Sequence, residues 1–347
     1  MSKTKSILTA CVLVASAMSL MSSCNDDWKD EQYVQYISFK APIDDSWPRT
    51  GVTTVYVPFT RLNDDGTPRY GAEGESSYQL PVLVAGSTDN ENDLNVNIAH
   101  SDTLPILNYE RFGTREELYY KDMSEYATVP TSIFIPKGQN KALLDIRMHF
   151  QNLDMRDRYV LPLTIAPGEG YQRNPRKNYA TAMLRIYPYN NYSGNFQASN
   201  TQFFIVDANN PDNEPGAMST VMSYAVDDNT CFIYAGKFSE LSMDRHPYKI
   251  YLHFNAIDDN HGTITMDAED PDINFVQNKV ARYQIVWTQD QVQDFLKYYN
   301  VILNDIDYNF DDITTSPGRI ITYNVRGGMT MQRRLNMQKP VEDQIEF

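Results

Sequence analysis

The chain has 347 residues, a formal net charge of −15 and 41% hydrophobic residues, with 24 Tyr and 15 Phe. This length suits two domains of ordinary size, and the apolar content is sufficient for a core in each of them. The strong negative charge argues against a nucleic-acid partner and against electrostatic binding to anionic lipid.

The start of the chain reads as a targeting segment. A short basic beginning precedes an apolar run over 7–21, and two serines then lead directly into Cys24. A basic segment, an apolar segment and small residues before the cut form a secretory signal, and a Cys at this place is typical of bacterial lipoproteins. We therefore predict a signal peptide over 1–23, and a lipidated Cys24 that begins an acidic tether over 24–32. An ordinary signal or one membrane helix is the alternative, although a spanning helix needs about 20 apolar residues.

The cysteine count limits covalent cross-linking in the mature protein. Cys11 leaves with the signal and Cys24 carries the lipid, so Cys231 alone remains. An intramolecular disulfide is then impossible, and the fold must rely on its apolar core.

The segment 33–188 is predicted to be an immunoglobulin-like β-sandwich. Apolar or alternating runs between turn signals predict strands at 33–39, 53–60, 79–84, 94–100, 131–136, 142–149, 159–166 and 179–187. The run from Leu94 to Ile98 alternates with a period of two, as half-buried strands do. One helical patch is expected around 114–120. About eight strands in this length are typical of a sandwich.

The segment 189–347 is predicted to be an antiparallel β-barrel with one packed α-helix, after a linker at 188–191. Its expected strands are 203–206, 219–225, 230–234, 249–255, 262–267, 281–287, 319–325 and 329–335, with a hairpin turn at 258–262. Residues 288–291 have the pattern of a capping box. Val292, Phe295, Leu296 and Tyr299 then recur at helical spacing, which predicts a helix over 288–299.

Several short stretches resemble a known family. They are Leu107-Asn108-Tyr109-Glu110-Arg111-Phe112, Leu118-Tyr119-Tyr120, Phe134-Ile135-Pro136-Lys137-Gly138, Tyr159-Val160-Leu161-Pro162-Leu163, Asn174-Pro175-Arg176-Lys177, Tyr192-Ser193-Gly194 and Arg333-Arg334-Leu335-Asn336. As a set they resemble the two-domain surface lipoproteins of Bacteroidetes, which join an immunoglobulin-like domain of unknown function to a lipocalin-like domain. The resemblance covers nearly the whole mature chain.

The resemblance implies a place in a polysaccharide-utilisation locus, beside an outer-membrane glycan importer. It implies lipid anchoring in the outer membrane, facing the cell exterior, and a supporting role in glycan capture. The family supplies no site motif, so no binding residue follows from it.

Catalytic and cofactor motifs are absent from the sequence. The five histidines are scattered without the spacing of a zinc site, and no serine-hydrolase elbow or phosphate-binding glycine loop occurs. The acidic stretch 305–312 lacks the Glu that a glycosidase acid would need, so we expect a solvated loop there. The two acidic loops around Gly66 and Gly262 do not match the EF-hand calcium-binding pattern. A looser calcium site at Asp258-Asp259 or 89–93 stays an open alternative. We predict no enzyme, no cofactor and no metal.

The candidate glycan-binding residues are aromatic, because flat sugar faces stack on large rings. Trp47 stands before a proline in an expected loop, and Tyr298 and Tyr308 lie in the second domain, where a barrel mouth is a common ligand site. Trp287 follows two apolar residues and is predicted to lie in the core.

These observations favour a non-catalytic, surface-exposed lipoprotein that binds a polysaccharide or oligosaccharide, or assists its capture. A structural or adhesive lipoprotein with protein partners and no sugar binding is the first alternative. A glycan-cleaving enzyme with an unrecognised site and a carrier of lipophilic molecules are the others.

Overall fold

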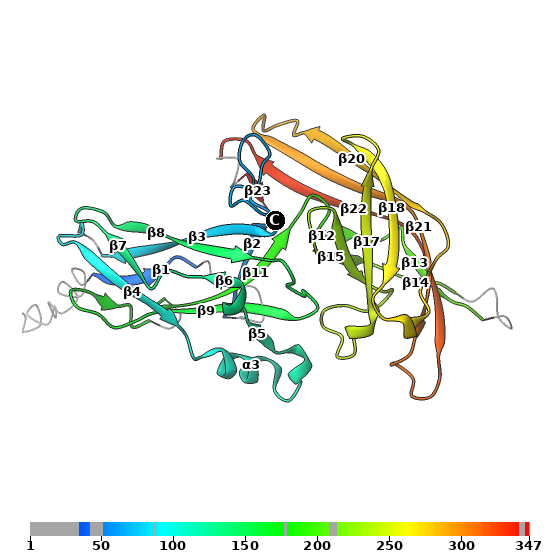
Figure 1. Ribbon diagram of the computed structural model, residues 1–347, viewed down its shortest axis with the longest axis horizontal. Helices are drawn as coiled ribbons and strands as arrows, with labels where there is room; N and C mark the ends of the chain where they lie inside the picture. The colour runs from blue at the N-terminus through cyan, green and yellow to red at the C-terminus, as the bar shows by residue number, and fades with distance from the viewer. Residues whose placement is uncertain are drawn as a thin grey trace, which may run out of the picture.

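The computed structural model describes residues 35–41, 51–86, 88–176, 179–207, 214–339 and 344–346. The predicted signal peptide, Cys24, the tether and Trp47 lie outside these residues. Figure 1 shows two parts side by side, an N-terminal part made of β-sheets and a C-terminal barrel. Strands account for 52% of the structure, which confirms the all-β prediction. No helix in the described ranges is long and apolar enough to cross a membrane.

The N-terminal part contains two curled sheets. One has the strand order β10 (Gln172–Arg173), β1 (Tyr36–Phe39), β3 (Glu75–Ala85), β8 (Lys141–His149) and β6 (Ala127–Thr128). The other has the order β2 (Thr53–Pro58), β11 (Thr181–Tyr189), β9 (Arg158–Ile165), β4 (Leu94–His100) and β7 (Ser132–Ile135), with β5 (Tyr120–Asp122) beside β9. Strand alternation decides which side chains enter the core: in β2, Val55 and Val57 are buried, whereas Thr54 and Tyr56 face outward.

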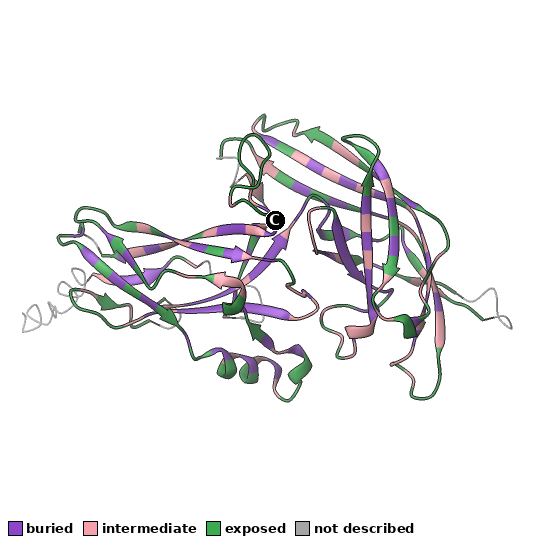
Figure 2. Ribbon diagram, viewed as in Figure 1, coloured by how far each residue is buried: buried purple, intermediate pink, exposed green. Residues whose placement is uncertain are grey.

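The barrel is a closed ring of eight strands. In ring order these are β12 (Gly194–Gln197), β15 (Thr220–Ala225), β16 (Thr230–Tyr234), β17 (Lys249–Ala256), β18 (His261–Ala268), β20 (Ala281–Gln289), β21 (Leu296–Asp312) and β22 (Ile321–Asn336). The ring closes because β22 pairs with both β21 and β12. The short strands β13 (Gln202–Ile205), β14 (Gly216–Ala217), β19 (Val276–Gln277) and β23 (Ile345–Glu346) extend this sheet. Figure 2 shows buried and exposed residues alternating along the barrel strands.

Aromatic side chains fill the inside of the barrel. Tyr192 stacks on Phe254 with ring centroids 4.0 Å apart, and Tyr283 packs edge-on against both rings at 5.2 and 5.4 Å. Tyr308 and Phe310 of β21 are each 1% exposed. This filled interior argues against the carrier of lipophilic molecules, which needs an open apolar cavity.

The predicted helix over 288–299 is wrong. These residues form the end of β20, a turn and the start of β21, and Trp287 lies opposite Tyr299 in the ladder. Asp290 accepts hydrogen bonds from the backbone N–H groups of Val292 and Gln293, so the capping residues close a hairpin turn instead of a helix. Pairing along the whole length of β20 outweighs the local helical spacing.

Three smaller expectations also differ. The α-helix of the N-terminal part is α3 (Leu104–Phe112), whereas the patch expected around 114–120 contains the short 3₁₀ segment Glu116–Leu118 and the start of β5. The acidic stretch 305–312 is part of β21 and not a loop. The strands expected at 319–325 and 329–335 are one continuous strand, β22, whose partner β21 is bulged between Leu303 and Ile306.

The connection between the two parts is fixed by hydrogen bonds. Asn190 follows β11, and its side-chain oxygen accepts from the N–H groups of Tyr192 and Ser193 at 2.8 Å. Its side-chain nitrogen donates to Asp227 O at 2.7 Å, and Arg333 of β22 donates to Asn190 O at 2.6 Å. The predicted linker is therefore bonded to the barrel on two sides and holds the junction in one arrangement.

Candidate functional site

A cleft of about 580 Å³ lies at the junction of the two parts. One wall is the outer face of β2 and β11, and the other is formed by β12, β15 and the segment that follows β16. Figure 1 shows β11, β12 and β15 next to one another at the centre of the molecule. Small-molecule sites usually measure about 300–1,000 Å³ and occur preferentially between domains. The cleft is therefore the candidate functional site.

Three tyrosine rings form a stack across this junction. Tyr56 and Tyr187 are cross-strand partners with ring centroids 5.6 Å apart, and Tyr187 stacks on Tyr224 of the barrel at 6.2 Å. Tyr56 is 36% exposed, whereas Tyr187 and Tyr224 are 7% and 3% exposed. The stack runs from solvent into the junction, and its outer ring presents a partly exposed aromatic surface.

One carboxylate fixes the hydroxyl groups of the two buried rings. Tyr187 and Tyr224 each donate to Glu240 Oε2 at 3.1 Å, and Arg185 donates to the same oxygen at 2.6 Å. The guanidinium group of Arg158 lies 3.9 Å from Glu240 Oε1. Burial acts to raise the pKa of Glu240, but attraction to Arg185 and Arg158 outweighs it, so this pKa is lowered overall. The carboxyl group stays ionised near neutral pH and is unsuited to act as a general acid.

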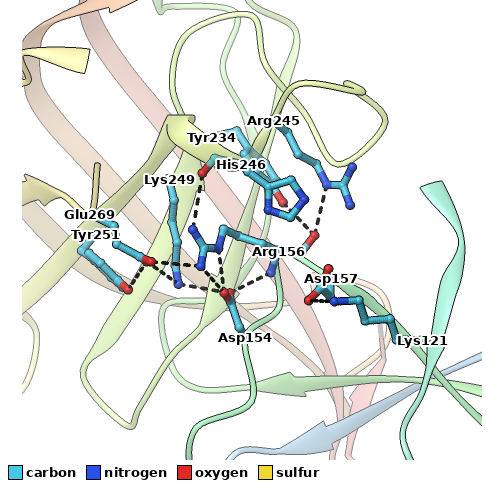
Figure 3. A network of polar contacts seen from close by, with 10 residues as sticks. All are labelled: Lys121, Asp154, Arg156, Asp157, Tyr234, Arg245, His246, Lys249, Tyr251 and Glu269. Carbon is cyan, nitrogen blue, oxygen red and sulfur yellow. Dashed lines mark hydrogen bonds and ion pairs between the residues drawn. The ribbon is translucent and has the colours of Figure 1, made fainter. Parts of the chain in front are cut away.

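Four charges form a closed ring that also crosses the junction, and we call it the charge ring (Figure 3). Asp154 and Arg156 come from the N-terminal part, and Lys249 and Glu269 come from the barrel. Lys249 Nζ lies 3.1 Å from Asp154 and 3.1 Å from Glu269, while Arg156 pairs with Asp154 at 2.5 Å and with Glu269 at 2.9 Å. Each charge thus has two neighbours of opposite sign, so the ring favours one arrangement of the two parts.

Backbone groups strengthen the same contact. The carbonyl oxygen of Arg156 accepts from Arg245 Nε at 3.1 Å and from the Tyr234 hydroxyl at 3.4 Å. Thr60 donates to Asp228 of the barrel at 3.0 Å, and Glu73 accepts from the backbone N–H of Asp228 at 3.1 Å. Because these bonds connect both walls, the cleft is preformed.

Acid is expected to weaken the junction. Burial acts to raise the pKa values of Glu240, Asp154 and Glu269, but their cationic partners and hydrogen-bond donors lower all three overall. A carboxyl group whose pKa is lower in the folded than in the unfolded protein stabilises the fold at pH values above its unfolded-state pKa, which is about 4 for these groups. This stabilisation is lost as the pH falls through the folded-state pKa. The melting temperature should therefore stay nearly constant from pH 7 to 5 and drop steeply below about pH 4. Differential scanning fluorimetry measures this dependence, and a melting temperature that stays constant down to pH 3 would contradict a stabilising role of these three carboxylates.

The two predicted glycan-binding residues that the structure describes, Tyr298 and Tyr308, do not line the cleft. Tyr308 is 1% exposed, and its hydroxyl accepts from the Gly236 N–H at 3.1 Å, so it cannot serve as an exposed stacking surface. Tyr298 is half-buried on β21, and its hydroxyl donates to Asp290 at 2.8 Å within the hairpin turn. Trp287, expected in the core, is 54% exposed at the end of β20. Neither Tyr298 nor Trp287 is among the described residues that line the cleft.

The acidic residues of β21 are used in ion pairs and hydrogen bonds. Asp305 bonds Lys279 at 2.6 Å and Arg282 at 2.8 Å, and the fully buried Asp312 lies 3.1 Å from Lys237. Within the described ranges, no group of three or more His, Cys, Asp or Glu side chains is arranged to hold a metal ion.

The key residues of the cleft carry a weak signal in the sequence. In the strands predicted at 53–60 and 179–187, Tyr56 and Tyr187 stand at outward positions between buried aliphatic neighbours. Aromatic rings on the outer face of two strands indicate a surface that is covered by another part of the protein or that binds a ligand. Glu240 lies in an irregular segment and has no local signal.

The architecture defines a class, an all-β protein of two firmly joined parts with a preformed aromatic cleft between them. Comparison with known proteins finds two family models along the chain. Residues 28–169 match a family model described as a domain of unknown function, DUF4973, and residues 180–330 match a second family model, of a C-terminal domain. Comparison with curated proteins gives no match.

Several solved structures from Bacteroides are similar over the whole fold. An auxiliary nutrient binding protein from Bacteroides thetaiotaomicron is 38% identical, with a TM-score of 0.80, covering 86% of this chain and 96% of that one. A protein of unknown function from Bacteroides ovatus is 37% identical, with a TM-score of 0.77, covering 90% of this chain and 100% of that one. A multidomain protein including DUF1735, also from Bacteroides ovatus, is 34% identical, with a TM-score of 0.77 and the same coverage. The chain belongs to this family of two-part Bacteroides proteins.

Proposed function

We propose that this protein is a non-catalytic, accessory binding component of nutrient capture, and that its ligand is a glycan. The observation that carries the proposal is the preformed cleft of about 580 Å³ with Tyr56 at its edge. A relative with 38% identity is described as an auxiliary nutrient binding protein, which supports the same role here.

The chemistry of the cleft supports binding without catalysis. Glycoside hydrolysis usually needs two carboxyl groups about 5–10 Å apart, one of them protonated. Glu240 is the one carboxylate among the described lining residues, and it is held ionised by two arginines. Asp305 and Asp312 of the acidic stretch are both engaged in ion pairs.

We further propose a cellular location for the protein and an identity for each of its two parts. The lipid on Cys24 would hold the protein on the outer membrane, facing the cell exterior and beside a glycan importer. The lipoprotein-like signal and the resemblance described above support this location. In the same proposal the N-terminal sheets are an immunoglobulin-like sandwich and the barrel is lipocalin-like. The pairing of two curled sheets and the closed eight-stranded ring support these identities.

Replacing Tyr56 with alanine is expected to weaken glycan binding at least tenfold, which corresponds to about 1.4 kcal/mol. The substitution removes the partly exposed ring at the edge of the cleft and leaves the buried pair of tyrosines in place. The measurement is affinity electrophoresis of the purified protein through gels that contain plant, fungal or host polysaccharides, followed by titration calorimetry with oligosaccharides of the retarding glycan.

The matched control is Tyr109→Ala on α3, because Tyr109 is 68% exposed and does not line the cleft. The control should bind like the unchanged protein. If no polysaccharide of a broad panel retards the unchanged protein, while a protein partner is recovered from outer-membrane extracts, the alternative of a structural or adhesive lipoprotein without sugar binding replaces this proposal. Equal binding by both variants would place the glycan site elsewhere.

A further inference from the structure

The barrel wall of the cleft carries polar side chains that face the tyrosine wall. Asn195 of β12 and Thr220 of β15 are exposed and line the cleft, and so does Ser219. None of these three side chains makes a hydrogen bond with any residue in the described ranges. They therefore keep their full hydrogen-bonding capacity for water or a ligand.

The strand register places these groups on one surface. Asn195 lies opposite Met222, and Thr220 lies opposite Gln197, so Asn195 and Thr220 stand on the same outer face of the β12–β15 pair. Tyr224 continues that face and joins the tyrosine stack. One wall thus offers an aromatic ring, and the facing wall offers an amide and hydroxyl groups.

The charged groups at the cleft are already neutralised. Glu240 is bonded to Arg185 at 2.6 Å, and Lys237 lies 3.1 Å from Asp312. An anionic ligand would therefore meet no unpaired cation among the described lining residues. An entirely apolar ligand would leave Asn195 and Thr220 without partners after water is expelled, which costs binding energy.

We propose that the cleft binds a segment of a neutral carbohydrate chain, with one sugar ring against Tyr56 and its hydroxyl groups bonded to Asn195 and Thr220. This inference rests on the proposed function and adds the chemical class of the glycan and the residues that select it. It also requires both parts of the protein, because the ring and the polar groups belong to opposite walls.

The experiment compares neutral and anionic polysaccharides with the purified protein and two variants, Asn195→Ala and Thr220→Val. We expect retardation by at least one neutral glycan, such as a xylan, mannan or β-glucan, and none by polygalacturonate or chondroitin sulfate. Binding should persist at about 0.5 M salt, where charge attraction is screened within a few ångströms. Each variant should lose about fivefold or more in affinity while its melting temperature stays unchanged.

The matched control is Asn304→Ala, an exposed asparagine on β21 that is not among the described lining residues. Salt-sensitive binding to anionic polymers alone would overturn the assignment of a neutral glycan. Binding that depends on Tyr56 but is unaffected in both barrel-wall variants would overturn their role, while the proposed function would stand. If no glycan binds at all, the proposed function itself fails.

Discussion

The Glu240→Gln variant is expected to melt about 10 °C below the unchanged protein. Arg158 and Arg185 have side chains only 2% and 13% exposed, and Glu240 is their shared counter-ion. Removing one partner of a buried ion pair costs about 3–5 kcal/mol, since the remaining charges stay desolvated and here also repel each other. A loss of that size shifts the melting temperature of a domain of 150–250 residues by about 2–4 °C per kcal/mol.

Glutamine keeps the size of the side chain and one acceptor oxygen, so the comparison isolates the charge. The control is Glu110→Gln on α3, where the carboxylate is exposed and the expected change is within about 1 °C. Differential scanning calorimetry of both variants at pH 7 is the measurement. A Glu240→Gln protein with an unchanged melting temperature would show that the two arginines do not depend on this carboxylate.

The Lys249→Met variant is expected to lose about 2 kcal/mol of stability and to loosen the junction. The Lys249 side chain is 6% exposed and pairs with both acids of the charge ring. Methionine preserves the apolar stem but leaves Asp154 and Glu269 with Arg156 as their common partner. The loss is smaller than for Glu240 because Arg156 remains and Glu269 is 39% exposed, where solvent screens its charge.

Two measurements separate docking from general destabilisation. Limited proteolysis and small-angle X-ray scattering should show a more cleavable and more extended molecule for Lys249→Met. The exposed Lys141→Met on β8 serves as the control and should behave like the unchanged protein. Glycan affinity should fall with the loss of docking, although Lys249 does not line the aromatic cleft. An unchanged scattering curve together with full affinity would mean that the charge ring does not position the walls.

Most strands followed from local patterns. β4 and β16 begin and end at the predicted residues, and the hairpin turn between β17 and β18 lies where the turn chemistry placed it. These segments have strict alternation or strong turn residues, so their local preference agrees with the final fold. The filled barrel also agrees with a sequence so rich in tyrosine and phenylalanine.

The region 288–312 shows where local patterns fail. Its first half has a capping box and helical spacing, and its second half has four acidic residues, yet both belong to one barrel hairpin. Pairing of β21 with two neighbouring strands decided the outcome, together with Lys279, Arg282 and Lys237, which neutralise Asp305 and Asp312 from elsewhere in the chain. No short segment of the sequence contains both the acidic residues of β21 and the strands and cations that pair with them.

Composition and local patterns were enough to predict the all-β class, most strands of the two parts other than β12 and β21, and the lack of recognisable catalytic motifs. Each of these depends on composition or on residues close together in the chain. The tertiary structure alone decided the site, because Tyr56, Tyr187, Asn195, Thr220 and Glu240 meet only after two separate sheets dock. The contacts that dock the two parts join residues far apart in the chain, such as Thr60 and Asp228 at 168 positions, so no local preference encodes them.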